Sequence, residues 1–374
     1  MSASGPLKGV KVLEFAGIGP GPFAGMMLSD MGADVLRIER KGAPNPPANR
    51  LDARGRRTIA LDLKQPHAVN ACLKLCEKAE IVFEGNRPGV MERLGLGPDA
   101  MLARNPRLVY GRMTGWGQHG PYAPMAGHDI NYLSLTGALH AIGTEEKPVP
   151  PLNLAADYGG GAMFLITGLL AGIIHARATG QGQVVDAGMT DGASYLMTLF
   201  YGMHAAGTWE DRRRANIIDG GAPFYDTYRC ADGNWISIGS MEPQFYALLL
   251  EKTGVGERLT QPQMDRESWP DMQQVLRDIF ATRTRQQWCD LLENTDVCFA
   301  PVLSLTEAPK HPHNVARETF VEVSGVVQPA PAPRFSATPG AIQWPPAPIG
   351  EDVRGTLGQW GVDQETIATL SPGA

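Results

Sequence analysis

The first 115 residues alternate between short apolar runs and longer segments with helical periodicity. The apolar runs lie at 10–15, 35–38, 58–62, 81–83 and 108–110. The helical patterns lie between them, at 23–31, 69–79 and 101–105. Strands that alternate with helices are typical of a mainly parallel sheet with helices on both faces. The pattern therefore predicts an α/β domain at the start of the chain.

The pattern becomes more helical after residue 132. Apolar segments at 162–174 and 193–205 predict two buried helices, with a short strand at 183–187 between them. Residues 224–238 predict a β-hairpin around the turn at 230–233, and helices follow at 245–253 and 286–293. We predict a large domain at 1–190 completed by 328–374, a linker helix and linker at 191–223, a small α+β domain at 224–312 and a return linker at 313–327.

Composition narrows the class of protein. The 374 residues include 33 basic and 39 acidic ones, a formal net charge of −6, which disfavours a dedicated nucleic-acid binder. The five cysteines are odd in number and scattered, which indicates a reducing compartment rather than a disulfide framework. The apolar stretch at 162–174 is shorter than the roughly 20 residues that span a bilayer. We expect a cytoplasmic protein without a membrane span.

Two small motifs resemble ligand sites only superficially. Cys72 and Cys76 lie one helical turn apart, but no second Cys/His pair follows at zinc spacing, so we expect no metal site. Gly17, Gly19 and Gly21 follow the first predicted strand, but the third glycine of a dinucleotide fingerprint would occupy position 22, which is Pro22. A tight strand-to-helix turn is the favoured interpretation.

Basic residues gather at or after the predicted strand ends. They are Arg37, Arg40, Arg54, Arg56, Arg57, Lys64, Arg87 and Arg93. Loops at the carboxyl ends of the strands of such a sheet face one crevice, where ligands bind. Arginine suits phosphates geometrically and stacks on planar rings. The set predicts a polyanionic, nucleotide-like ligand, with solvated loop charges as the alternative.

Two further positions are candidates for chemistry. His128 lies in a polar loop that precedes an apolar segment, where a capping or core histidine is the alternative. Asp157 precedes three glycines and an apolar helix. It is either an N-cap or part of a site in which glycines admit a ligand and helix amides stabilise an oxyanion.

Several motifs together resemble the family III CoA-transferases. They are residues 36–40, 60–64, 87–96 and 157–161, and the resemblance extends over roughly 6–340. The motif Gly-His-Asp-Ile-Asn-Tyr at 127–132 resembles the branch of that family that racemises 2-methylacyl-CoA thioesters. The resemblance implies an α/β fold, with a large Rossmann-like domain containing a parallel sheet and a smaller α+β domain. It also implies an interlaced homodimer, in which each subunit is threaded through the other.

The resemblance also implies residue roles. His128 and Asp157 match the two acid/base residues, and Glu242 matches a carboxylate that orients the histidine. Substrate and CoA contacts are implied for Arg40, Leu61, Asp62, Leu63, Lys64, Gly85, Asn86, Arg87, Arg93, Gly127, Asp129, Ile130, Asn131 and Tyr132. Asn86 departs from the family, which often has an aromatic residue there. No metal or separate cofactor is implied, because CoA arrives as part of the acyl-CoA substrate.

Two other activities remain open from the sequence. In a CoA-transferase the same aspartate is a nucleophile that forms an acyl anhydride, and His128 is not needed. A catalytically silent CoA-binding scaffold is disfavoured, because both candidate bases are present.

Overall fold

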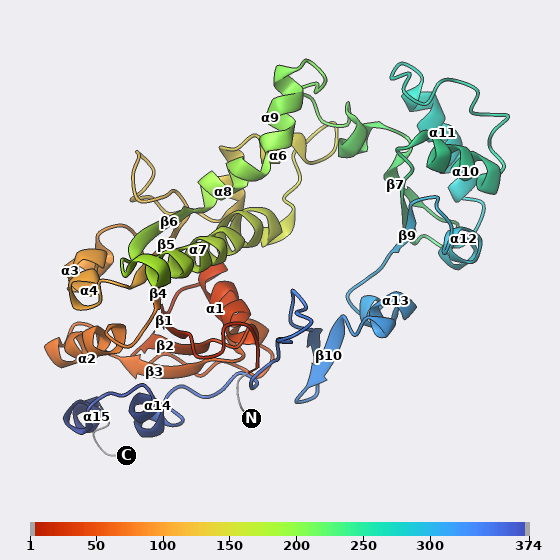
Figure 1. Cartoon of the computed structure of the whole chain (residues 1–374). Coiled ribbons are helices and arrows are strands. Elements are labelled where there is room, and N and C mark those ends of the chain that lie inside the picture. The colour runs from red at the N-terminus through yellow and green to blue at the C-terminus, as the bar shows by residue number, and fades with distance from the viewer. Residues whose placement is uncertain (1–3, 371–374) are drawn as a thin grey trace. The chain divides into compact units, whose positions relative to one another are not determined.

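The computed structural model describes residues 4–370 and divides into two compact units (Figure 1). The first unit comprises the residues up to 136, residues 151–197 and the residues from 318 onward. The second comprises residues 137–150 and 198–317. Residues 137–150, which we expected in the large domain, therefore group with the second unit.

The first unit is built on a six-stranded parallel sheet. Its strands are β1 (Lys11–Phe15), β2 (Asp34–Arg40), β3 (Arg57–Leu61), β4 (Ile81–Glu84), β5 (Val109–Thr114) and β6 (Gln183–Gly188). The strand order is β3-β2-β1-β4-β5-β6, with every neighbouring pair parallel. The predicted α/β class and parallel sheet are confirmed. The strand order reverses direction between β1 and β4, and ligands bind at such a switch point in open α/β sheets.

Helices cover both faces of this sheet. One face carries α2 (Pro66–Cys76), α4 (Pro98–Arg104), α14 (Val353–Gln359) and α15 (Gln364–Leu370), whose apolar residues share one core cluster with the strands. The other carries α1 (Pro20–Asp30) and α7 (Met163–Thr179). Successive side chains of a strand point to opposite faces. Thus Leu13 joins the core cluster, whereas the neighbouring Glu14 lies against Gly25 of α1.

Among residues 4–370, one helical run, Leu152–Thr179, is long and apolar enough to cross a membrane by length and composition alone. It is longer than the segment at 162–174 that we predicted, and half of its most apolar stretch is buried. Gly168 and Gly172 bring α7 against the sheet, since an added Cβ would lie 2.5 Å from Val185 and 2.6 Å from Val109. This close packing against β5 and β6 accounts for the apolar face of the run.

The second unit contains a three-stranded antiparallel sheet. Its strands are β7 (Tyr225–Arg229), β8 (Trp235–Gly239) and β9 (Phe299–Val302), in that order. The hairpin predicted at 224–238 is present. Its helices are α6 (Ala138–Ala141), α9 (Thr198–Ala205), α10 (Pro243–Thr253), α11 (Trp269–Phe280), α12 (Arg285–Leu292) and α13 (Pro312–Ala316).

Two sequence predictions are wrong in detail. The single helix expected at 193–205 is broken at Met197 into α8 (Met189–Leu196) and α9, which belong to different units. The return linker expected at 313–327 contains part of an antiparallel hairpin, β10 (Phe320–Val323) and β11 (Val326–Pro329). Its strands are only four residues long, too short for alternation to stand out in the sequence.

Candidate active site

A cavity of about 500 Å³ opens at the switch point of the parallel sheet. Its walls come from the turns after β1 and β4, the segment after β5, and the loop before α5 (Asp129–Ser134). The lining residues include Gly17, Gly19, Gly21, Gly85, Asn86, Arg87, Met113, Trp116, Met125, Gly127, His128, Tyr132, Asp157 and Met189. Residues that the sequence singled out for separate reasons therefore share one cavity in the first unit.

His128 is the N-cap residue of α5, and its backbone is fixed by the helix start. The His128 amide donates to Asn131 Oδ1 over 3.0 Å, and the Asn131 amide donates to the His128 carbonyl over 2.8 Å. Trp116 packs edge-on against Tyr132, with ring centroids 4.8 Å apart. A Cβ at Gly127 would lie 2.7 Å from the Tyr132 ring, so only glycine fits there. Asn131 thus caps the helix, whereas Tyr132 supports the loop and lines the cavity.

Asp157 lies in a π-helical segment, η3 (Ala155–Ala162), that runs directly into α7. The buried Asp129 carboxylate accepts hydrogen bonds through Oδ2 from the amides of Ala156, at 2.9 Å, and Asp157, at 2.8 Å. Burial raises the pKa of the Asp157 carboxyl, and the nearby Asp129 charge raises it further. A hydrogen bond from Asn153 and the proximity of His128 oppose this shift. Asp129, which we expected to contact substrate, therefore joins the His128 loop to the Asp157 segment.

The three glycines after Asp157 serve helix packing. A Cβ at Gly160 would lie 2.5 Å from the Ala193 amide nitrogen of α8, and one at Gly161 would lie 2.8 Å from Met189. A Cβ at Gly159 would lie 3.1 Å from the Leu154 carbonyl oxygen, and none of the three glycines is among the residues that line the cavity, so the structure gives no support to the suggestion that they admit a ligand. The Asp157 amide is also occupied by Asp129, so it is not available to an oxyanion. Asp157 is not an N-cap, because it lies inside η3.

Four arginines of the basic set are committed to partners within the first unit. Arg37 and Arg56 are buried and both pair with Glu14, at 2.8 and 3.3 Å. Arg54 is buried against Asp30 at 2.6 Å, and Arg57 pairs with Asp34 at 2.6 Å. Arg37, Arg54 and Arg56 are structural, because a buried guanidinium is tolerated only with such partners, and the half-buried Arg57 is held by its ion pair.

The other four cations are exposed. Arg40 ends β2, Lys64 and Arg87 follow β3 and β4, and Arg93 ends α3 (Val90–Arg93). None has a carboxylate within ion-pair distance among residues 4–370. These uncompensated cations lie at or after the carboxyl ends of neighbouring strands, where such groups are suited to binding phosphate, and we call the set the candidate phosphate-binding edge.

The remaining predicted CoA contacts differ in their exposure. Leu61 is buried in the core cluster, and Leu63 packs against it, so neither side chain is free for a ligand. The Asp62 carboxylate stabilises the turn after β3 by accepting a hydrogen bond from the backbone amide of Lys64 over 3.1 Å. The backbone amide of Asn86 donates a hydrogen bond to Glu84 Oε2 over 2.6 Å, and Asn86 lines the cavity. Ile130 is exposed and is not among the residues that line the cavity.

Glu242 belongs to the second unit. It is the exposed N-cap residue of α10, and its side chain makes no capping hydrogen bond. The cavity described above is lined by residues of the first unit.

Sequence reasoning missed several lining residues. Trp116, Met113, Met125 and Met189 give the cavity an apolar wall. Gly19, which we assigned to a turn, lies against the acid/base candidate, since an added Cβ would lie 3.0 Å from Asp157 Oδ2. The positions of Met113 and Met189 at the ends of β5 and β6 were the available signal.

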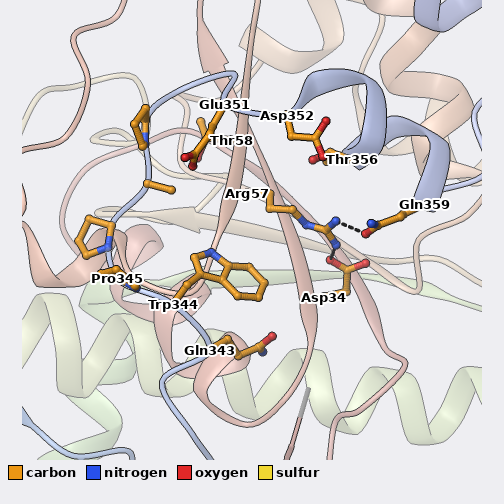
Figure 2. Close-up of a pocket in the computed structure, with 13 residues that line it drawn as sticks. Asp34, Arg57, Thr58, Gln343, Trp344, Pro345, Glu351, Asp352, Thr356 and Gln359 are labelled. Atoms are coloured by element: carbon orange, nitrogen blue, oxygen red, sulfur yellow. Dashed lines mark hydrogen bonds and ion pairs between the residues drawn. The ribbon is translucent and has the colours of Figure 1, made fainter. Parts of the chain in front are cut away.

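A second cavity of about 630 Å³ lies at the amino ends of β2 and β3, opposite the switch-point crevice. Figure 2 shows the Trp344 ring between Pro345 and the Arg57 side chain, which is held by Asp34 and Gln359. Asp352 caps α14. The residues that line this second cavity include no histidine or cysteine, so the cavity offers no acid/base pair like that of the first cavity.

Within residues 4–370, no group of three or more His, Cys, Asp or Glu side chains is arranged to hold a metal ion. Cys72 and Cys76 lie in the core cluster, where burial raises the pKa of each thiol to about 12. The thiolate form that binds metals is therefore disfavoured, and these cysteines fill the core.

Comparisons with known proteins show the family to which the chain belongs. Residues 7–353 match the sequence pattern of CoA-transferase family III. The chain is 42% identical to the alpha-methylacyl-CoA racemase of Mus musculus over 97% of this chain and 96% of that protein. It is 41% identical to the racemase of Homo sapiens over 98% and 96%. The crystal structure of a CAIB/BAIF family protein from Brucella suis has the same fold, with a TM-score of 0.82 and 23% identity over 96% of this chain and 100% of that one. The chain belongs to CoA-transferase family III.

Proposed function

We propose that the protein interconverts the two epimers of 2-methylacyl-CoA thioesters by removing and re-adding the α-proton. The observation that carries the proposal is that His128 and Asp157 line one cavity, with burial raising the pKa of Asp157 toward the range useful for proton transfer. The racemase relatives, at 41–42% identity over nearly the whole chain, support the same reaction.

Inversion at the α-carbon needs a base on one face and an acid on the other. In our proposal one of His128 and Asp157 removes the proton, the thioester becomes an enolate, and the other residue protonates the opposite face. The two exchange roles in the reverse direction. The Asp129 amide begins α5 beside His128 and has no acceptor among residues 4–370, so we assign it to the enolate oxygen.

The CoA part of the substrate is assigned to the exposed cations Arg40, Lys64, Arg87 and Arg93. Arg87 lines the cavity, which supports a path from the candidate phosphate-binding edge to the reacting carbon. In this proposal the thioester itself supplies CoA, and no separate cofactor takes part.

Arg40→Ala and Arg93→Ala are expected to raise KM for the acyl-CoA by about tenfold each, because each removes a charge-assisted phosphate contact. The effect on kcat is expected to be smaller, since the contacts are remote from the α-carbon. Arg107→Ala is the matched control, because Arg107 is exposed but precedes β5. Unchanged KM in both variants would refute the assignment.

The alternative function is transfer of CoA between carboxylic acids through an anhydride on Asp157. The two activities differ in their need for a second acid. We expect one epimer of a 2-methylacyl-CoA to become a mixture of epimers with no added acid. Strict dependence on an added carboxylic acid, with formation of its CoA thioester, would favour transfer.

We also propose that the protein is an interlocked homodimer and that Glu242 orients the histidine of the partner's site. Large apolar side chains remain exposed in each unit, Ile174 and Tyr195 in the first and Leu199 and Tyr201 in the second. Such surfaces are typical of subunit interfaces.

Co-expression of a His128→Ala chain with a Glu242→Ala chain tests the shared site. If Glu242 acts across subunits, each mixed dimer has one intact site, and its activity is expected to exceed that of either parent by far. Mixing the separately purified variants is the control, because interlocked chains exchange only after unfolding. If co-expression gives no recovery, Glu242 does not act in the partner's site.

A further inference from the structure

Three charged side chains are buried beneath the turn that separates β1 from α1. Glu14 lies between the two guanidiniums of Arg37 and Arg56, and all three are nearly inaccessible to solvent. Arg37 also contacts Glu39 at 3.2 Å. Burying such a set costs desolvation energy that ion pairing often does not recover, so a buried ion network is weak evidence for stability. The reaction proposed above does not use it as acid or base.

The network holds both ends of the turn. Arg37 Nη2 donates to the Gly17 carbonyl at 3.4 Å, where the turn begins. Arg56 Nη1 donates to the Pro22 carbonyl at 2.8 Å, where the turn has become α1. Gly25 brings α1 onto the Glu14 carboxylate, since a Cβ there would lie 2.3 Å from Oε2. The buried ion network therefore fixes the backbone of the turn at both ends.

The other side of the turn meets the segment that carries Asp157. Gly19 has a φ of +65° and lies so close to Asp157 that a Cβ would be 3.0 Å from Oδ2. Phe23, at the start of α1, stacks on Tyr158 with ring centroids 4.5 Å apart. Two consecutive residues of η3 are thus held by the turn and by the first turn of α1.

We propose that Arg37 and Arg56, joined through Glu14, are positioning residues that fix the Asp157 carboxylate by holding the turn at 17–22 against it. The inference rests on the proposed racemisation, in which Asp157 serves one face of the α-carbon. A shift of about 1 Å in a catalytic group can cost on the order of 10²-fold in rate.

The test uses Arg37→Gln, which removes one anchor of the turn, and Gly19→Ala, which crowds Asp157 directly. The measurement starts from each pure epimer in heavy water. It compares two rates: the rate at which deuterium enters the α-position with the configuration retained, and the rate at which the configuration inverts. For the epimer that His128 deprotonates, uptake with retention needs only His128, whereas inversion also needs Asp157. We expect the ratio of retained exchange to inversion for that epimer to rise at least about tenfold in both variants, with little change in KM.

Two controls separate positioning from general damage. Arg54→Gln removes a buried arginine that pairs with Asp30 away from the turn, and Gly9→Ala introduces strain at a φ of +90° with no atom within 4 Å of the new Cβ. Both are expected to lower the melting temperature and leave the ratio unchanged. If Arg37→Gln does not fold, Arg56→Gln, which removes the anchor on the Pro22 carbonyl, and the conservative variant Arg37→Lys decide in its place. Equal loss of exchange and inversion in the variants overturns the inference, whereas a wild-type enzyme without any exchange overturns the proposed function instead.

Discussion

Replacing either His128 or Asp157 by alanine is expected to lower the rate of inversion by at least about 10²-fold, the usual loss when acid–base catalysis is removed. Both residues line the same cavity, and each serves one face of the α-carbon in the proposed reaction. Chiral analysis of the acyl-CoA after incubation with each variant measures the effect. Asp157→Asn keeps the shape of the side chain and is expected to lose as much.

The matched control is His313→Ala, because His313 is an exposed histidine on α13 in the second unit. It is expected to keep the wild-type rate. Near-normal inversion by either His128→Ala or Asp157→Ala would contradict the assignment of two bases.

Asp129 is expected to have the next largest effect, through two separable contributions. Asp129→Ala removes the acceptor of the Ala156 and Asp157 amides, and each unsatisfied donor costs about 1–3 kcal/mol. Inversion is expected to fall by tenfold or more, because the segment that carries Asp157 loses its link to the His128 loop.

Asp129→Asn separates charge from geometry, since the amide oxygen still accepts hydrogen bonds. Burial is the largest cause of the raised pKa of Asp157, and the Asp129 charge is the second. Removing that charge therefore lowers the pKa of Asp157. Asp157 must be ionised to act as a base. For the epimer that Asp157 deprotonates, the acid limb of the kcat/KM profile is therefore expected to move to lower pH. An acid limb that stays in place, or moves to higher pH, would show that the Asp129 charge does not act on Asp157.

The parallel sheet could be predicted because its central strands β1, β4 and β5 are buried on both faces and give largely apolar runs separated by helical segments. The break at Met197 could not, because the residues on both sides of it are apolar and keep helical periodicity. Domain membership across that break depends on tertiary contacts that no local pattern contains.

His128 and Asp157 could be picked out as candidates from the sequence, but their pairing as acid and base came from the family resemblance, and the structure places both on one cavity. The division of the arginines was not predictable, because Arg37 and Arg40 lie on the same strand and differ in burial and in carboxylate partners that only the fold brings to Arg37. The role of Asp129 was equally hidden. Its carboxylate meets amides 27 and 28 residues later in the chain, and only the folded backbone brings them together.

The central claim is that the residues of this cavity remove and replace the proton on the α-carbon of the thioester. They do not transfer CoA between carboxylic acids. One pure epimer of a 2-methylacyl-CoA, incubated with the enzyme in heavy water and no added acid, tests it most directly. The account predicts deuterium at C2 together with loss of stereochemical purity, and an intact thioester. An α-proton that stays unexchanged, with CoA passing to a carboxylic acid once one is supplied, would contradict it.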